Sequence, residues 1–210
     1  MIGIFGGTFD PIHYGHLRSA IEVKEIFKLT EVRLIPSSQP PHRDQPHAPA
    51  LMRAEMLRLA IANQPELILD TRELNRPGAS FMVDTLVSLS HDFPKQTLLL
   101  TIGCDAFNRL TSWHQWQRLF DFAHIAVLTR PGYIIGQLDN FFSERLAISK
   151  NELSDQLAGK LYFQPITQLD ISATKIREII ANDRNPAFLL PDSVIAFIKQ
   201  HQLYQNLTAT

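Results

Sequence analysis

The sequence predicts an α/β protein with a Rossmann-like, doubly wound and mostly parallel sheet, followed by a small helical C-terminal part. Short apolar runs alternate with segments of helical periodicity, which is typical of βαβ units. Glycines and polar residues cluster directly after the apolar runs, where a parallel sheet places its ligands. A chain of 210 residues is long enough for one sizeable domain. We therefore expect residues 1–210 to form a single domain, with residues 172–210 as a helical subregion.

Short apolar runs predict the strands, because strands buried on both faces of a parallel sheet are apolar throughout. The first run covers residues 2–5 and ends at Gly6-Gly7. The run most typical of a strand covers residues 97–102 and ends at Gly103. Further strands are expected at residues 32–35, 67–69 and 125–128.

Helical spacing of apolar residues predicts helices at residues 15–28, 51–62, 80–90, 172–181 and 192–201. Asp10-Pro11 resembles the approach to the first of these helices. The second helix is expected to bury one face, made of Met52, Met56, Leu59 and Ala60. Residues 37–49 are rich in proline and polar side chains, which favours an exposed loop.

Composition excludes several classes of protein. The formal net charge of -1 does not fit a globally basic nucleic-acid binder, so no nucleic-acid partner is expected. Any anionic ligand must be held by local donors rather than by the field of the whole protein. Cys104 is the single cysteine, and we find neither a signal peptide nor a stretch apolar enough to span a bilayer. We expect a cytoplasmic protein, without membrane association, that is a monomer or a homodimer.

The segment from Gly6 to His16 carries the strongest chemical signal. Adjacent glycines let backbone N–H groups approach a phosphate, and the helix start that follows favours negative charge. His13 and His16 are three residues apart, so on a helix they share one face, and Thr8 adds a hydroxyl donor. The Gly-Lys-Ser/Thr phosphate loop, the dinucleotide glycine fingerprint and the His-Glu-x-x-His zinc motif are all absent. Taken alone, two histidines at a helix start are more often structural than catalytic.

His13-Tyr14-Gly15-His16 resembles the signature of the His-x-Gly-His nucleotidyltransferases. Other segments resemble one branch of that superfamily, the bacterial nicotinate-nucleotide adenylyltransferases. These segments run in order along nearly the whole chain: residues 36–43, residues 76–81 with Thr85-Leu86, residues 102–105 with Trp113, residues 171–177, and residues 190–204. The resemblance implies a single nucleotidyltransferase domain.

The resemblance implies that AMP passes from ATP to nicotinate mononucleotide, giving deamido-NAD and pyrophosphate, with Mg²⁺ bound to the ATP. It implies a catalytic role for His16, which would donate to the α-phosphate with help from His13 and Thr8. No dedicated protein ligands for the metal are expected, because Mg²⁺ usually binds through substrate phosphates and water. The residues implied to bind ATP, the last three through the leaving pyrophosphate, are Gly6, Gly7, Phe9, Gly103, Asp105, Ser172, Thr174 and Arg177.

On the acceptor side, the resemblance implies that Trp113 stacks on the pyridine ring and that Thr85 contacts the nicotinate carboxylate, with Ser80 nearby. His42 and Arg43 would reach phosphates from the proline-rich loop. Each of these residues also has a plainer structural interpretation. A tryptophan is more often part of a core, Ser172 and Asp105 suit helix caps, and the loop can be simply solvated.

Three positions depart from the family pattern: Phe81 replaces a frequent tyrosine, Met82 a threonine, and Ala173 a second serine. These departures affect the acceptor more than the reaction class. Three alternatives therefore stay open. Two are adenylyltransferases acting on nicotinamide mononucleotide or on phosphopantetheine, and the third is a non-catalytic domain that senses nucleotides.

Overall fold

Six parallel strands form the sheet in the part of the chain that the structure describes. A computed structural model of the chain describes residues 1–39, 45–130, 132–167 and 169–205. The strands lie in the order β3-β2-β1-β4-β5-β6, and every neighbouring pair is parallel. Their bounds are β1 Ile2–Gly7, β2 Glu31–Pro36, β3 Leu67–Leu69, β4 Leu98–Gly103, β5 His124–Thr129 and β6 Leu161–Pro165. From β1 the chain adds strands first toward one edge of the sheet and then, from β4, toward the other edge. This is the strand order of a doubly wound Rossmann-like sheet.

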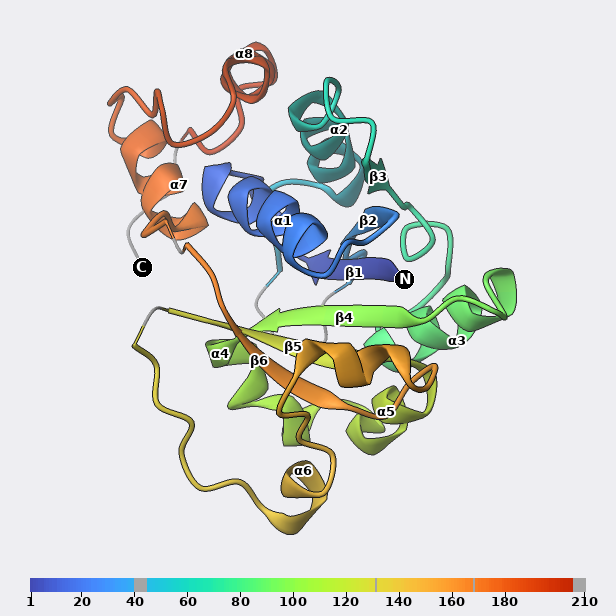
Figure 1. The fold of residues 1–210 in the computed structure, drawn as a ribbon. Coiled ribbons are helices and arrows are strands. Elements are labelled where there is room, and N and C mark those ends of the chain that lie inside the picture. Colours follow the sequence, from blue (N-terminus) through green and yellow to red (C-terminus); the bar gives the residue numbers. More distant parts are fainter. Residues whose placement is uncertain (40–44, 131, 168, 206–210) are drawn as a thin grey trace.

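Helices cover both faces of the sheet (Figure 1). On one side lie α1 Tyr14–Ile26, α2 Ala50–Ala60, α7 Ala173–Ala181 and α8 Asp192–Gln200. On the other lie α3 Met82–Asp92, α4 Cys104–Phe107, α5 Leu119–Phe122 and α6 Asn140–Ser143. Three 3₁₀ turns, η1 Leu110–Ser112, η2 Trp116–Arg118 and η3 Lys150–Ser154, occur in the connections. No helix among the described residues has the length and apolar character needed to cross a membrane.

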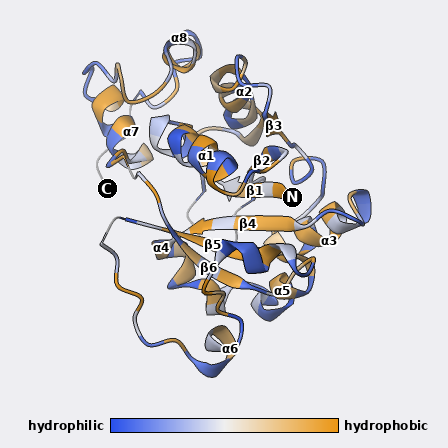
Figure 2. Ribbon diagram, viewed as in Figure 1, coloured by the Kyte–Doolittle hydropathy of each residue, from blue (hydrophilic) through white to orange (hydrophobic). Residues whose placement is uncertain are grey.

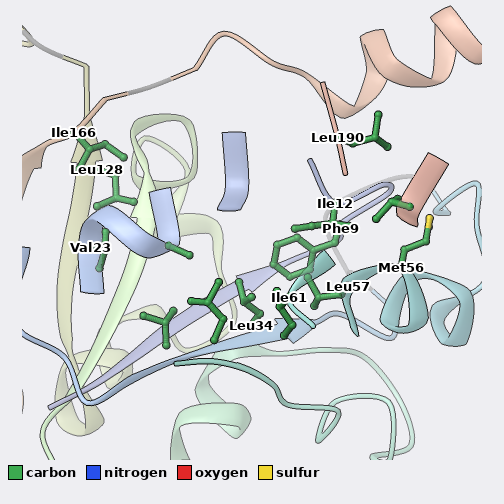
Figure 3. Close-up of a cluster of buried hydrophobic side chains, with 14 of the residues drawn as sticks. Phe9, Ile12, Val23, Leu34, Met56, Leu57, Ile61, Leu128, Ile166 and Leu190 are labelled. Carbon is green, nitrogen blue, oxygen red and sulfur yellow. The ribbon is translucent and has the colours of Figure 1, made fainter. Parts of the chain in front are cut away.

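Two apolar clusters, one on each face of the sheet, form the core. The central strands are predominantly apolar, and the helices around them contain both apolar and hydrophilic residues (Figure 2). The first cluster packs α1, α2, α7 and α8 onto the sheet, and it includes Phe9, Leu34 and Met56 (Figure 3). The second cluster packs α3 and α5 on the opposite face, through residues such as Leu86 and Phe120. Burial on both faces explains why the central strands appear in the sequence as apolar runs.

The structure confirms the five predicted strands and five predicted helices, with ends that differ by a few residues. It adds β6, which the sequence analysis missed. This strand lies at the edge of the sheet, and its residues alternate between buried and partly exposed. Such a short alternating segment that ends in proline lacks the continuous apolar run that marked the other strands.

The predicted buried face of α2 was partly wrong. The buried residues of this helix are Arg53, Ala54, Met56 and Leu57. Only Met56 belongs to the face expected from apolar spacing. Arg53 is only 1% exposed, and its guanidinium can be buried because it donates to several backbone carbonyls.

Candidate active site

The sheet opens between β1 and β4 at the carboxyl ends of these strands. The two strands pair from Ile2 and Leu98 to Ile4 and Leu100, and the pairing stops there. Beyond that point β1 pairs only with β2, up to Gly7, while β4 pairs only with β5, up to Gly103. In doubly wound sheets, ligands bind in the crevice that such a reversal of strand order creates.

The turn after β1 brings the two motif histidines together at the start of α1. His13 is the N-cap of this helix in an extended conformation, and its carbonyl accepts from the N–H groups of His16 and Leu17. The ring centroids of His13 and His16 are 3.7 Å apart, with planes inclined by 26°. A Cβ atom on Gly15 would lie 2.9 Å from Nδ1 of His13. Glycine at this position is therefore required for the stacked arrangement.

Burial keeps the His13 imidazole neutral. His13 is 5% exposed, and burial lowers its pKa from 6.5 to about 4. Its Nδ1 atom is buried and has no hydrogen-bond partner among the described residues. At neutral pH the two stacked rings therefore do not carry two positive charges, and His13 retains an unused nitrogen toward its surroundings.

The buried guanidinium of Arg53 ties together the segments that follow β1 and β2. Its NH1 group donates to the carbonyl of Thr8 at 2.6 Å. Its NH2 group donates to the carbonyl of Ser37 at 2.7 Å and to that of Ser38 at 3.3 Å. Its Nε group donates to the carbonyl of Ala48 at 3.0 Å. One side chain thus fixes the spacing between two loops at the mouth of the crevice.

Asp10 is the second buried charge at this end of the sheet. Its carboxylate accepts from the backbone N–H groups of His47 and Ala48 and from the hydroxyl of Tyr204, 2.7 Å away. Asp10 therefore lies in the approach to the first helix, as predicted, but its carboxylate does not cap that helix. Instead, it links the turn after β1 to the segment before α2 and to the C-terminal part of the described chain.

The start of α7 lies against the same turn. NH1 of Arg177 donates to the Asp10 carbonyl at 2.7 Å, and NH2 donates to the Thr174 hydroxyl at 3.4 Å. The Nε of Arg177 is buried without a hydrogen-bond partner among the described residues. Ser172 is the N-cap, and its hydroxyl accepts from the N–H of Lys175 at 3.3 Å. The capping interpretation of Ser172 is thus confirmed, and Arg177 retains a donor directed at no protein group.

On the acceptor side, Thr85 does not have a free hydroxyl. Thr85 is fully buried, and its hydroxyl donates to Oε1 of Glu73 at 2.7 Å. Burial raises the pKa of the Glu73 carboxyl, and hydrogen bonds from Thr85 and Ser80 act in the opposite direction. NH2 of Arg76 donates to the same threonine oxygen at 3.2 Å. The hydroxyl of Thr85 is thus engaged within the protein, and a contact of Thr85 with the acceptor stays a prediction.

Ser80 connects the approach to α3 with the loop after β2. Its hydroxyl accepts from the N–H of Ser38 at 2.8 Å, and its own N–H donates to the Gln39 carbonyl at 3.0 Å. His42 and Arg43, which were expected in the same loop, lie outside the described residues. Ser80 thus positions the described part of the loop.

The two tryptophans after β4 differ in their surroundings. Trp116 is partly buried beside the second apolar cluster and packs against Phe141 and Phe142, with ring centroids 4.8 and 5.2 Å away. Trp113 is partly buried at the edge of the same cluster. Phe81 stacks on His114, the residue after Trp113, with centroids 4.3 Å apart. Stacking of Trp113 on a ligand thus stays a prediction from the resemblance.

The glycines and Asp105 occupy the predicted strand ends. A Cβ on Gly6 would lie 2.4 Å from Cε of Met82, so this glycine makes room for α3. Gly103 is exposed at the end of β4 and is the N-cap of α4, followed by the exposed Asp105, whose side chain does not cap the helix. Phe9 is 2% exposed and packs in the core, so only its backbone is available to a nucleotide.

Two residues of this region were missed as site residues from the sequence. Ser37 has a buried hydroxyl without a hydrogen-bond partner among the described residues. Arg53 lies within the apolar pattern of α2. Its position next to apolar residues that prove to be buried was the one feature that could have singled it out. The described residues include no group of three His, Cys, Asp or Glu side chains able to hold a metal ion. The buried unpartnered atoms among the described residues include the Ser37 hydroxyl and the Arg177 Nε, which can donate to an anionic ligand.

Comparisons with known proteins agree with this architecture. The model of the cytidylyltransferase-like family matches residues 4–179. A protein of Methylococcus capsulatus, named a probable nicotinate-nucleotide adenylyltransferase, is 47% identical over 97% of this chain and 99% of its own length. A protein of the same name from Hahella chejuensis is 45% identical over 99% of this chain and 97% of its own.

A solved structure with the same fold is the Plasmodium falciparum nicotinic acid mononucleotide adenylyltransferase complexed with NaAD. It aligns with a TM-score of 0.73 at 18% identity and covers 97% of this chain and 96% of that one. The chain therefore belongs to the cytidylyltransferase-like family and, within it, to the nicotinate-nucleotide adenylyltransferases.

Proposed function

We propose that this protein transfers the AMP part of ATP to nicotinate mononucleotide, forming deamido-NAD and pyrophosphate. The observation that carries the proposal is the pair of stacked histidines at the start of α1, beside the crevice between β1 and β4. The names of relatives at 45–47% identity supply the acceptor.

The reaction needs alignment of two anions more than it needs a strong base. A phosphate oxygen of the acceptor attacks the α-phosphorus of ATP, and the bond from that phosphorus to the bridging oxygen of the β-phosphate breaks. Pyrophosphate carries away the electron pair. Because the nucleophile is already an anion, the protein contributes mainly by positioning the phosphates and stabilising the charge that gathers on the α-phosphate.

We assign His16 as the donor to the α-phosphate, with His13 and Thr8 beside it. The N-terminus of α1, a helix of 13 residues, adds a favourable dipole for an anion. Neutral His13 can stack on His16 without charge repulsion. Gly6, Gly7 and the backbone of Phe9 provide the turn along which the nucleotide binds.

We assign Ser172, Thr174 and Arg177 to the leaving pyrophosphate. Arg177 supports this role because its Nε is a buried donor without a partner among the described residues. Asp105, exposed after Gly103, is suited to accept hydrogen bonds from ribose hydroxyls at the end of β4. ATP would thus extend from the β4 side of the crevice to the start of α7.

On the acceptor side, we assign Trp113 to stacking on the pyridine ring and Ser80 to positioning the loop after β2. His42 and Arg43 stay predictions for contacts with phosphate. We further propose that Mg²⁺ enters on the phosphates of ATP and offsets their charge. We also propose a cytoplasmic location, and a monomer or homodimer.

The position of an isotopic label tests the reaction. The protein is incubated with nicotinate mononucleotide, Mg²⁺ and ATP labelled at either the α- or the γ-phosphate. The proposal predicts that the α-label enters a dinucleotide and that the γ-label is recovered in pyrophosphate. Recovery of the γ-label as free phosphate, with no labelled dinucleotide, would instead indicate an ATPase.

The His16→Ala variant provides the matched test of the catalytic assignment. Loss of one donor to transition-state charge lowers kcat by roughly 10² or more. The measurement is the rate of dinucleotide formation at saturating substrates, with folding verified by circular dichroism. Near-normal turnover in the folded variant would remove the role assigned to His16.

A further inference from the structure

We propose that Arg53 and Tyr204 are positioning residues for adenylyl transfer, which hold the Thr8 turn and the Ser37 segment at the separation that the two reacting phosphates require. The inference rests on the proposed function. Neither residue has to touch a substrate, because both act through groups of the segments that follow β1 and β2.

The donors of Arg53 reach both segments that approach the reacting phosphates. Its NH1 donates to the carbonyl of Thr8, and its NH2 donates to that of Ser37. The side chain of Thr8 belongs to the nucleotide turn. The hydroxyl of Ser37 is buried without a hydrogen-bond partner among the described residues. The planar guanidinium has a fixed fork, and it therefore fixes the distance between the two carbonyls it joins.

The ladder between β1 and β2 ends at the same place. Gly7 pairs with Pro36, and the N–H of Ser37 donates to the Gly7 carbonyl at 2.9 Å. Past this hydrogen bond, Arg53 connects the two segments, through Thr8 after β1 and through Ser37 and Ser38 after β2. Loss of the fork would let the two loops move relative to each other without unpairing the strands.

Asp10 and Tyr204 complete the buried network. Arg53 lies close enough to Asp10 for electrostatic attraction, and the carboxylate also accepts from the Tyr204 hydroxyl at 2.7 Å. Tyr204 is 5% exposed, so its ring is part of the core and its hydroxyl is directed at Asp10. Because Asp10 lies two residues after Thr8 and its carbonyl accepts from Arg177, its orientation affects both the nucleotide turn and the start of α7.

A positioning role differs from a purely structural one in its kinetic signature. Misplacement of reacting groups by about 1 Å can cost roughly 10²-fold in rate while leaving ground-state binding largely intact. Substitutions in this network should therefore lower kcat more than they change the KM for ATP or the KM for the acceptor. A residue needed only for stability should lower the thermal midpoint and leave kcat unchanged at temperatures where the protein is folded.

Two conservative variants test the proposal. Arg53→Lys keeps the positive charge beside Asp10 but loses the fork, and Tyr204→Phe removes one oxygen while keeping the ring. We expect kcat to fall about tenfold or more in Arg53→Lys and about threefold or more in Tyr204→Phe. The assays are run at a temperature well below the midpoint of thermal unfolding. There, the KM for ATP and the KM for the acceptor should each change by less than about threefold.

Two matched controls carry the same substitutions elsewhere. Arg58→Lys lies on the same helix, where Arg58 pairs with Glu55 at the surface. Tyr162→Phe changes a tyrosine of β6 that packs against Phe27. Both controls should keep kcat and both KM values within about twofold of the parent. Should Arg53→Lys fail to fold, Tyr204→Phe carries the test alone.

The outcomes separate this inference from the proposed function. A lowered thermal midpoint with normal kcat in both variants would overturn the positioning role, as would a rise in KM with unchanged kcat. The parent protein is assayed with nicotinate mononucleotide, nicotinamide mononucleotide and phosphopantetheine, and the variants are assayed with whichever acceptor it uses. A parent protein that is inactive with all three would overturn the proposed function, and the positioning role with it.

Discussion

At the scale of single residues, His13 connects burial with a pH dependence of stability. Burial lowers the pKa of its imidazole from 6.5 to about 4, so the unfolded chain binds a proton at a higher pH than the folded chain does. The stabilising effect of the neutral ring is present above pH 6.5 and is lost as the pH falls toward 4. Between pH 7 and pH 5, this single residue should reduce the free energy of unfolding by about 2 kcal/mol.

The measurement is urea unfolding of the parent and of His13→Gln at pH 7 and pH 5. His124 is also buried with a lowered pKa, so the parent should lose stability from both histidines. His13→Gln should retain only the loss from the remaining groups. If the two proteins have the same difference between pH 7 and pH 5, His13 is not held neutral by folding.

At the scale of secondary-structure elements, the start of α7 combines a structural role with a proposed binding role. The hydroxyl of Ser172 caps the helix, and the same helix terminus is assigned to pyrophosphate. Aspartate caps a helix as well as serine does, but its charge repels an anion. Substitutions at this one position can therefore separate the two roles.

Ser172→Ala should lower the free energy of unfolding by about 1 kcal/mol, because the cap is lost. Ser172→Asp should leave stability within about 0.5 kcal/mol of the parent and raise the KM for ATP. The measurements are urea unfolding and initial rates with varied ATP. An unchanged KM for ATP in Ser172→Asp would confine Ser172 to capping.

The connection between β4 and β5 contains two tryptophans, Trp113 and Trp116, to which different roles are assigned. Trp113→Ala should raise the KM for the mononucleotide roughly tenfold, as expected for loss of a stacking platform, and change the KM for ATP little. Trp116→Ala removes contacts with Phe141 and Phe142, so it should cost about 2 kcal/mol of stability or more. A rise only in the KM for ATP in Trp113→Ala would place the acceptor elsewhere.

At the scale of the whole molecule, much of the fold could be predicted from the sequence. Strands such as β4 are buried on both faces, so local composition identifies them. The same was true of α1, which begins shortly after the Gly6-Gly7 turn. β6 escaped prediction because an edge strand has one partner and mixed burial.

The network around Arg53 could not be predicted in this way. Arg53, Asp10 and Tyr204 are far apart in the sequence, and each has a common alternative role at the surface. Only the fold brings them together. The hydrogen bond from the buried Thr85 hydroxyl to Glu73 is a further contact that local patterns did not predict. Long-range hydrogen bonds between buried polar groups are the information that local sequence patterns lack.

The identity of the acceptor is tested by comparing kcat/KM for pyrophosphate release between candidate acceptors. The assay uses ATP and Mg²⁺ with nicotinate mononucleotide, nicotinamide mononucleotide or phosphopantetheine as the acceptor. We predict a kcat/KM for the nicotinate form that exceeds the others by about 10²-fold or more. A site that pairs with a carboxylate discriminates against an acceptor without one, because its buried polar groups are then left unpaired. A higher kcat/KM with another acceptor, or no turnover with any of the three, would show that nicotinate mononucleotide is not the acceptor.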